Sequence, residues 1–76
     1  MNRQRRNMLN IAITELESAQ DIISDVCEDE SDALGNMPEN LESSDKYQKI
    51  EECVDCLENA ASSISDALDN LREAIS

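Results

Sequence analysis

Two of the three cysteines stand in a C-x-x-C pattern, Cys53 and Cys56, a spacing that often marks a redox centre or half of a zinc site. A zinc site needs four ligands, and the chain adds only Cys27 and has no histidine. The pair also falls inside an expected helix, away from a helix N-terminus that would lower a thiol pKa. We therefore expect structural thiols and neither metal nor cofactor. A zinc or redox module stays an open alternative.

Carboxylates are the other abundant chemistry. An acidic run at residues 28–32 (EDESD) ends the first expected helix, where its charge opposes the helix dipole. In a hairpin of two helices this run would lie near acids at the start of the second helix. The sequence predicts an acidic surface for a basic protein partner, with an ordinary solvated turn as the alternative. Its members are Glu28, Asp29, Glu30, Asp32, Glu51 and Glu52.

Catalysis has no candidate residues in this sequence. There is no histidine, no nucleophile elbow, no phosphate-binding glycine loop and no calcium-binding loop. One aromatic residue, one glycine and one proline argue against a sheet or a deep ligand cavity. We expect a protein that is not an enzyme.

The charge is strongly negative, at −12 for 76 residues, and it is unevenly distributed. Arg3, Arg5 and Arg6 are half of the six basic residues, whereas the first of the eighteen acids is Glu15. Such a surface repels nucleic acid and anionic membranes. The segment after the basic start is too short and polar for a signal peptide, and no apolar run approaches the ~20 residues of a membrane span. We expect a cytoplasmic protein with reduced cysteines.

Nine apolar positions in the second half of the chain alternate in steps of three and four residues. This average of about 3.5 residues keeps one seam of a helix turned toward a partner helix. The sequence predicts a helix over residues 45–75, capped by Ser43 or Ser44. The seam consists of Tyr47, Ile50, Val54, Leu57, Ala61, Ile64, Leu68, Leu71 and Ile75.

A first helix is expected over residues 5–34, followed by a connection at 35–44 in which Gly35 takes a left-handed conformation. Leu9, Leu16 and Ile23 repeat every seven residues. Further apolar residues widen the stripe to about half the circumference, more than a two-helix seam needs. Beside the repeat we place Ala12, Ala19, Val26 and Ala33, with Ile13, Cys27 and Leu34 widening one side and Met8 and Ile22 the other.

Two helices of similar length joined by a short connection predict an all-α, coiled-coil-like antiparallel hairpin. A column of small residues, Cys53, Ala60, Ala67 and Ala74, runs beside the seam of the second helix. With the wide face of the first helix, this column predicts a homodimer that forms a four-helix bundle. The alternative is a monomer whose alanines only favour helix. The expected seam and interface residues are Leu9, Leu16, Ile22, Ile23, Val54, Leu57, Ala60, Ile64, Ala67, Leu68, Leu71 and Ala74.

The chain resembles small acidic helical-hairpin proteins encoded by phages and prophages of Firmicutes. The resemblance rests on the basic start, the acidic heptad helix and the linker at residues 34–44 (LGNMPENLESS). It implies a phage accessory protein that binds a host or phage protein, and it assigns no site residue. A second hypothesis is a nucleic-acid mimic that inhibits a DNA- or RNA-binding defence protein.

Overall fold

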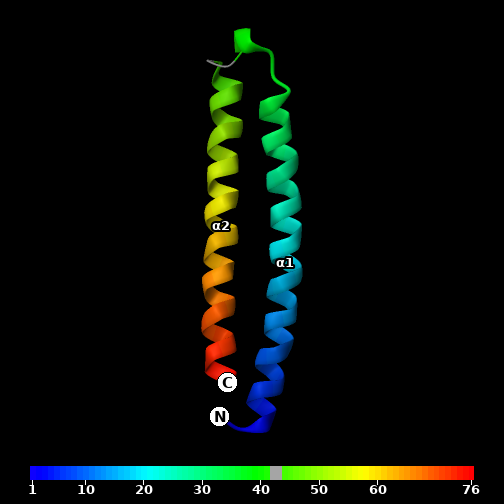
Figure 1. Cartoon of the computed structure of the whole chain (residues 1–76), viewed down its shortest axis with the longest axis vertical. Helices are drawn as coiled ribbons and strands as arrows, with labels where there is room; N and C mark the ends of the chain where they lie inside the picture. Colours follow the sequence, from blue (N-terminus) through cyan, green and yellow to red (C-terminus); the bar gives the residue numbers. More distant parts are fainter. Residues whose placement is uncertain (42–43) are drawn as a thin grey trace.

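Two long helices lie side by side and antiparallel, as Figure 1 shows. The computed structural model describes residues 1–41 and 44–76. Helix α1 spans Arg3–Gly35 and helix α2 spans Asp45–Ile75. The molecule measures 59 × 15 × 14 Å, and the described residues contain no β-strand. The expected all-α hairpin is therefore confirmed.

Side-chain caps set the start of both helices. The Oδ1 atom of Asn2 accepts a hydrogen bond from the backbone N–H of Arg5 at 2.8 Å, so α1 begins two residues earlier than predicted. Ser44 caps α2 and accepts from the N–H of Tyr47 at 3.2 Å. Ser43, the other predicted cap, lies outside the described residues.

The end of α1 differs from the expectation. Gly35 does not have a positive φ; it is the last helical residue, one beyond the predicted end. Asn36 closes the helix in a right-handed conformation, and its N–H donates to the carbonyl of Asp32 at 3.0 Å. Because this bond satisfies the last turn, no left-handed residue is needed there. Pro38 then precedes a short 3-10 helix, η1, at Glu39–Leu41.

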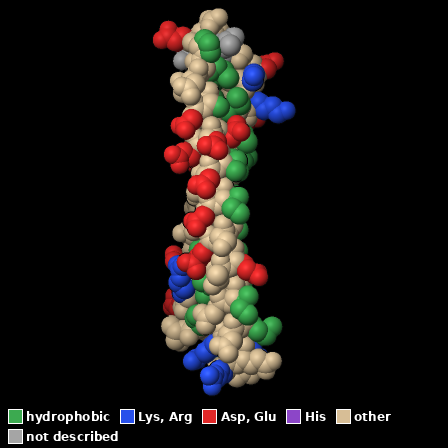
Figure 2. All heavy atoms as spheres, turned by 90° about the vertical axis from the view of Figure 1, so that its right-hand side faces the viewer, with side chains coloured by type: hydrophobic (Ala, Val, Ile, Leu, Met, Phe, Trp, Pro, Cys, Tyr) green, Lys and Arg blue, Asp and Glu red, His purple; other side chains and the backbone are tan. Residues whose placement is uncertain are grey.

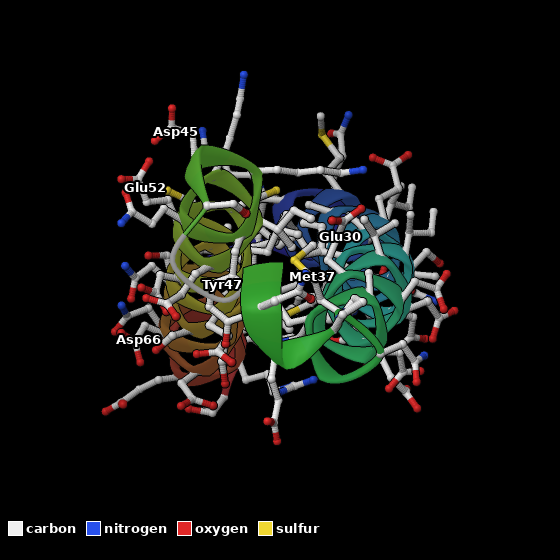
Figure 3. All side chains as sticks on the ribbon, turned by 90° about the horizontal axis from the view of Figure 1, so that it is seen from above. Glu30, Met37, Asp45, Tyr47, Glu52 and Asp66 are labelled. Atoms are coloured by element: carbon white, nitrogen blue, oxygen red, sulfur yellow. The ribbon has the colours of Figure 1, made fainter. Side chains whose placement is uncertain are left out.

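The core is one seam between the helices. All nine predicted seam positions of α2 are buried or half-buried. Leu68 and Val54, with exposed fractions of 3% and 7%, are its most shielded side chains, and Ile13 of α1 has 7%. Met37 lies between the helices at the loop end (Figure 3). A core this thin depends strongly on each of its members.

The seam of α1 is only partly the predicted one. Leu9, Leu16 and Ile23 are half-buried, as the seven-residue repeat predicts. In the column predicted beside them, Ala12 and Ala19 are half-buried, whereas Val26 is 44% exposed and Ala33 is exposed. The sequence placed the inner column at the side of the stripe, because one of its members is a glutamine. That column consists of Ile13, Gln20, Cys27 and Leu34.

Candidate interaction surface

The two long sides of the hairpin differ in chemistry. Glu17 and Arg72 each follow a seam residue directly, and their side chains form an ion pair at 3.3 Å across one side. The seam positions of each helix fall into two alternating sets, and Glu17 and Arg72 follow members of one set. In an antiparallel pair, residues that directly precede members of the other set therefore line the opposite side. On that opposite side the sequence places alanine, valine and cysteine, with Lys46 at the loop end as the charged exception.

This opposite side is an apolar face. Ile22 and Met8 adjoin it and are 64% and 61% exposed, large values for apolar side chains. Figure 2 shows hydrophobic side chains gathered along one edge of the rod over much of its length. Exposed apolar surface of this extent typically marks an interaction site. We define the apolar face as Met8, Ala12, Ala19, Ile22, Val26, Ala33, Cys53, Ala60, Ala67 and Ala74.

The residues predicted as seam and interface divide between two surfaces. Eight of them are buried or half-buried in the helix pair: Leu9, Leu16, Ile23, Val54, Leu57, Ile64, Leu68 and Leu71. The others belong to the apolar face, where Ala60 and Ala67 are half-buried and Ile22 and Ala74 are exposed.

The seam also contains polar side chains, which the apolar pattern did not identify. Gln20 donates from Nε2 to the carbonyl oxygen of Ala61 at 3.3 Å, and the bond is partly buried between the helices. Glu30, predicted as part of the acidic surface, is half-buried and lies on α1 near the loop end (Figure 3). The signal was present in their spacing, because both continue the alternation of three and four residues through Leu16, Ile23 and Leu34.

The acidic surface is exposed apart from Glu30. Glu28, Asp29 and Asp32 on α1 are exposed, as are Glu51 and Glu52 on α2. Figure 3 shows Glu52 pointing away from α1, together with other acids of α2. Acidic side chains also continue along the rod beyond the loop end (Figure 2). The predicted surface is thus the loop-end part of a longer acidic exterior.

The cysteines lie in two environments. The Sγ atom of Cys27 donates to the carbonyl oxygen of Val54 at 3.9 Å within the seam. Burial raises the pKa of the Cys27 thiol, and the nearby carboxylate of Glu58 raises it further. Cys53 and Cys56 are exposed. Among the described residues, no three Cys, Asp or Glu side chains come together as a metal site. The zinc or redox alternative therefore rests on the C-x-x-C spacing alone.

The described surface has no pocket. No helix over residues 1–41 and 44–76 is apolar enough for long enough to cross a membrane. Comparison with known protein families, curated proteins and solved structures finds no match to the chain. The candidate functional features of the described residues are therefore the acidic surface and the apolar face.

Proposed function

We propose that the chain is a non-enzymatic protein–protein interaction module that self-associates into a four-helix bundle and binds a basic protein partner through its acidic surface. The exposure of the carboxylates is the observation that supports binding through the acidic surface. Apart from Glu30, every Asp and Glu whose side chain the structure describes is exposed. Among the residues that the structure describes, the ion pairs are those of Arg72 with Glu17 and with Asp69. Most of the negative field therefore extends into solvent and attracts cationic surfaces.

The shape of the single hairpin supports the proposed self-association. Its radius of gyration is 17.3 Å, whereas a compact chain of this length has about 11 Å. Its accessible surface of 5707 Å² exceeds the roughly 4,700 Å² of a compact monomer of this mass. A second hairpin that covers one face would bring the surface per chain to the usual value.

The proposed biological setting is that of a phage accessory protein whose partner is a host or phage protein. The support for this setting is the linker resemblance together with the acidic exterior. A nucleic-acid mimic would share the same exterior, and competition by duplex DNA separates the two hypotheses. Only a mimic should lose its partner to DNA, because it occupies the phosphate-binding groove.

The experiment is affinity capture from bacterial lysate, with proteins identified by mass spectrometry. One variant neutralises the loop end through Asp29→Asn, Glu51→Gln and Glu52→Gln. A matched control neutralises three exposed acids at the other end of α2, Asp66→Asn, Asp69→Asn and Glu73→Gln. We expect a partner held by the native chain and the control but lost by the loop-end variant. Equal retention by all three chains would contradict a localised acidic binding surface.

A further inference from the structure

We infer that the apolar face binds a second copy of this chain with its ends exchanged, so that α1 lies against α1 and α2 against α2 of the partner copy. This inference rests on the self-association proposed above and adds the orientation of the two copies to the face that the sequence pattern indicated.

The area of the face suits a second copy. A side 59 Å long and 15 Å wide has a footprint of about 900 Å², close to the roughly 800 Å² per partner of a standard interface. The middle of the face carries alanine at positions 19, 60 and 67, which let another helix backbone approach closely. Ile22, Val26 and Met8 supply larger apolar groups that would lose their contact with water. A second copy of the hairpin has the same length and the same apolar face, so it can cover the face from end to end.

Charge selects the orientation. Arg3, Arg5 and Arg6 begin α1, and the acids near its other end are Glu28, Asp29 and Asp32. A two-fold axis along the rod would set the arginines of both copies beside one another. An axis across the rod sets the arginines of each copy beside the acids of the other. Because like charges at an interface repel and opposite charges attract, the second arrangement is favoured.

The second helix agrees with the same orientation. Lys46 and Lys49 stand at the start of α2, on the edge that leads into the apolar face. With the ends exchanged, they come beside the carboxyl end of α2 in the partner copy, where Glu73 lies. The two-fold axis then passes close to Ala19, the middle residue of α1.

The first test determines which face forms the contact between the two copies. Ile22→Asp places a charge on the apolar face, and Ile11→Asp is the control. Both side chains are exposed in the single hairpin, at 64% and 60%, so neither change should unfold it. Sedimentation equilibrium should give the native chain and Ile11→Asp twice the 8.5 kDa chain mass. Ile22→Asp should sediment as a helical monomer. A dimeric Ile22→Asp chain would overturn the choice of face.

The second test measures the orientation. A nitroxide label at Gln4→Cys is introduced after Cys27→Ala, Cys53→Ala and Cys56→Ser, in a chain shown by circular dichroism to stay helical. With the ends exchanged, pulsed electron resonance should place the two labels about 45 Å apart by helical rise. Labels within about 20 Å, the reach of adjacent helices, would overturn the orientation while the dimer stands. A native chain of monomer mass would overturn both the inference and the proposed self-association.

Discussion

Two side chains of α1 reach the backbone of α2 at a regular interval. Gln20 and Cys27, seven residues apart, donate to the carbonyl oxygens of Ala61 and Val54, which are also seven residues apart. A carbonyl oxygen has two lone pairs, so it can accept such a bond beside its own helical bond. A buried polar group that is satisfied in only one alignment favours that alignment over slipped ones. Gln20 therefore holds the two helices in register.

Glu30 is the seam residue whose polarity works against burial. Replacement Glu30→Leu should raise the free energy of unfolding by about 1 kcal/mol, because apolar surface replaces a half-buried carboxylate. Urea denaturation followed by circular dichroism, at matched protein concentration, measures the change. Asp32→Leu, at an exposed position, should change stability by less than about 0.5 kcal/mol. A less stable Glu30→Leu chain would show that the carboxylate supports the helix pair.

At the scale of the elements, each helix contributes one stripe to a thin core. The caps at Asn2 and Ser44 fix where the helices begin, and the stripe of each helix then faces its neighbour. Isolated helices are marginal in water, so most of their stability comes from this packing. The most buried side chains should therefore dominate the unfolding energy.

Leu68→Ala tests this dependence on packing. Leu68 has 3% of its surface exposed, so its truncation should lower the free energy of unfolding by about 2–5 kcal/mol. A loss of this size is enough to unfold much of so small a protein. Thermal denaturation followed by the helical signal in circular dichroism measures this loss of stability. Ile11→Ala is the matched control, because Ile11 is 60% exposed and should cost about 0.5 kcal/mol or less. Similar losses at both positions would contradict the assignment of the core.

At the scale of the whole molecule, net negative charge opposes folding. The ion pairs of Arg72 with Glu17 and Asp69 are about half exposed or more, and pairs of that kind contribute little. Self-repulsion along the rod therefore outweighs local attraction, and salt should weaken that repulsion.

Raising sodium chloride from about 10 mM to about 500 mM should raise the Tm by about 5 °C, since the Debye length shrinks several-fold. Circular dichroism at fixed protein concentration provides the measurement. The Glu51→Gln, Glu52→Gln double variant should respond less, because it carries less negative charge. A Tm that falls with salt would mean that attractive ion pairs dominate the molecule.

The sequence was a good guide to α2 and a weaker one to α1. Every seam position of α2 is apolar, so spacing alone identified the buried stripe from Tyr47 to Ile75. In α1 the apolar residues cover about half the circumference, and several neighbouring stripes fit them equally well. The polar seam residues Gln20 and Glu30 concealed the true stripe, and Val26 was placed inside although it is exposed.

By itself, then, the sequence determined two amphipathic helices, the start of α2 and an acidic exterior, because these depend on local spacing, capping and charge. Only the tertiary structure decided which stripe of α1 turns inward and that most of the remaining apolar residues of both helices, Ile11 excepted, lie on one side. The reason is geometric: in an antiparallel pair the side on which a residue lies depends on the alignment with the other helix, and neither helix encodes that alignment alone.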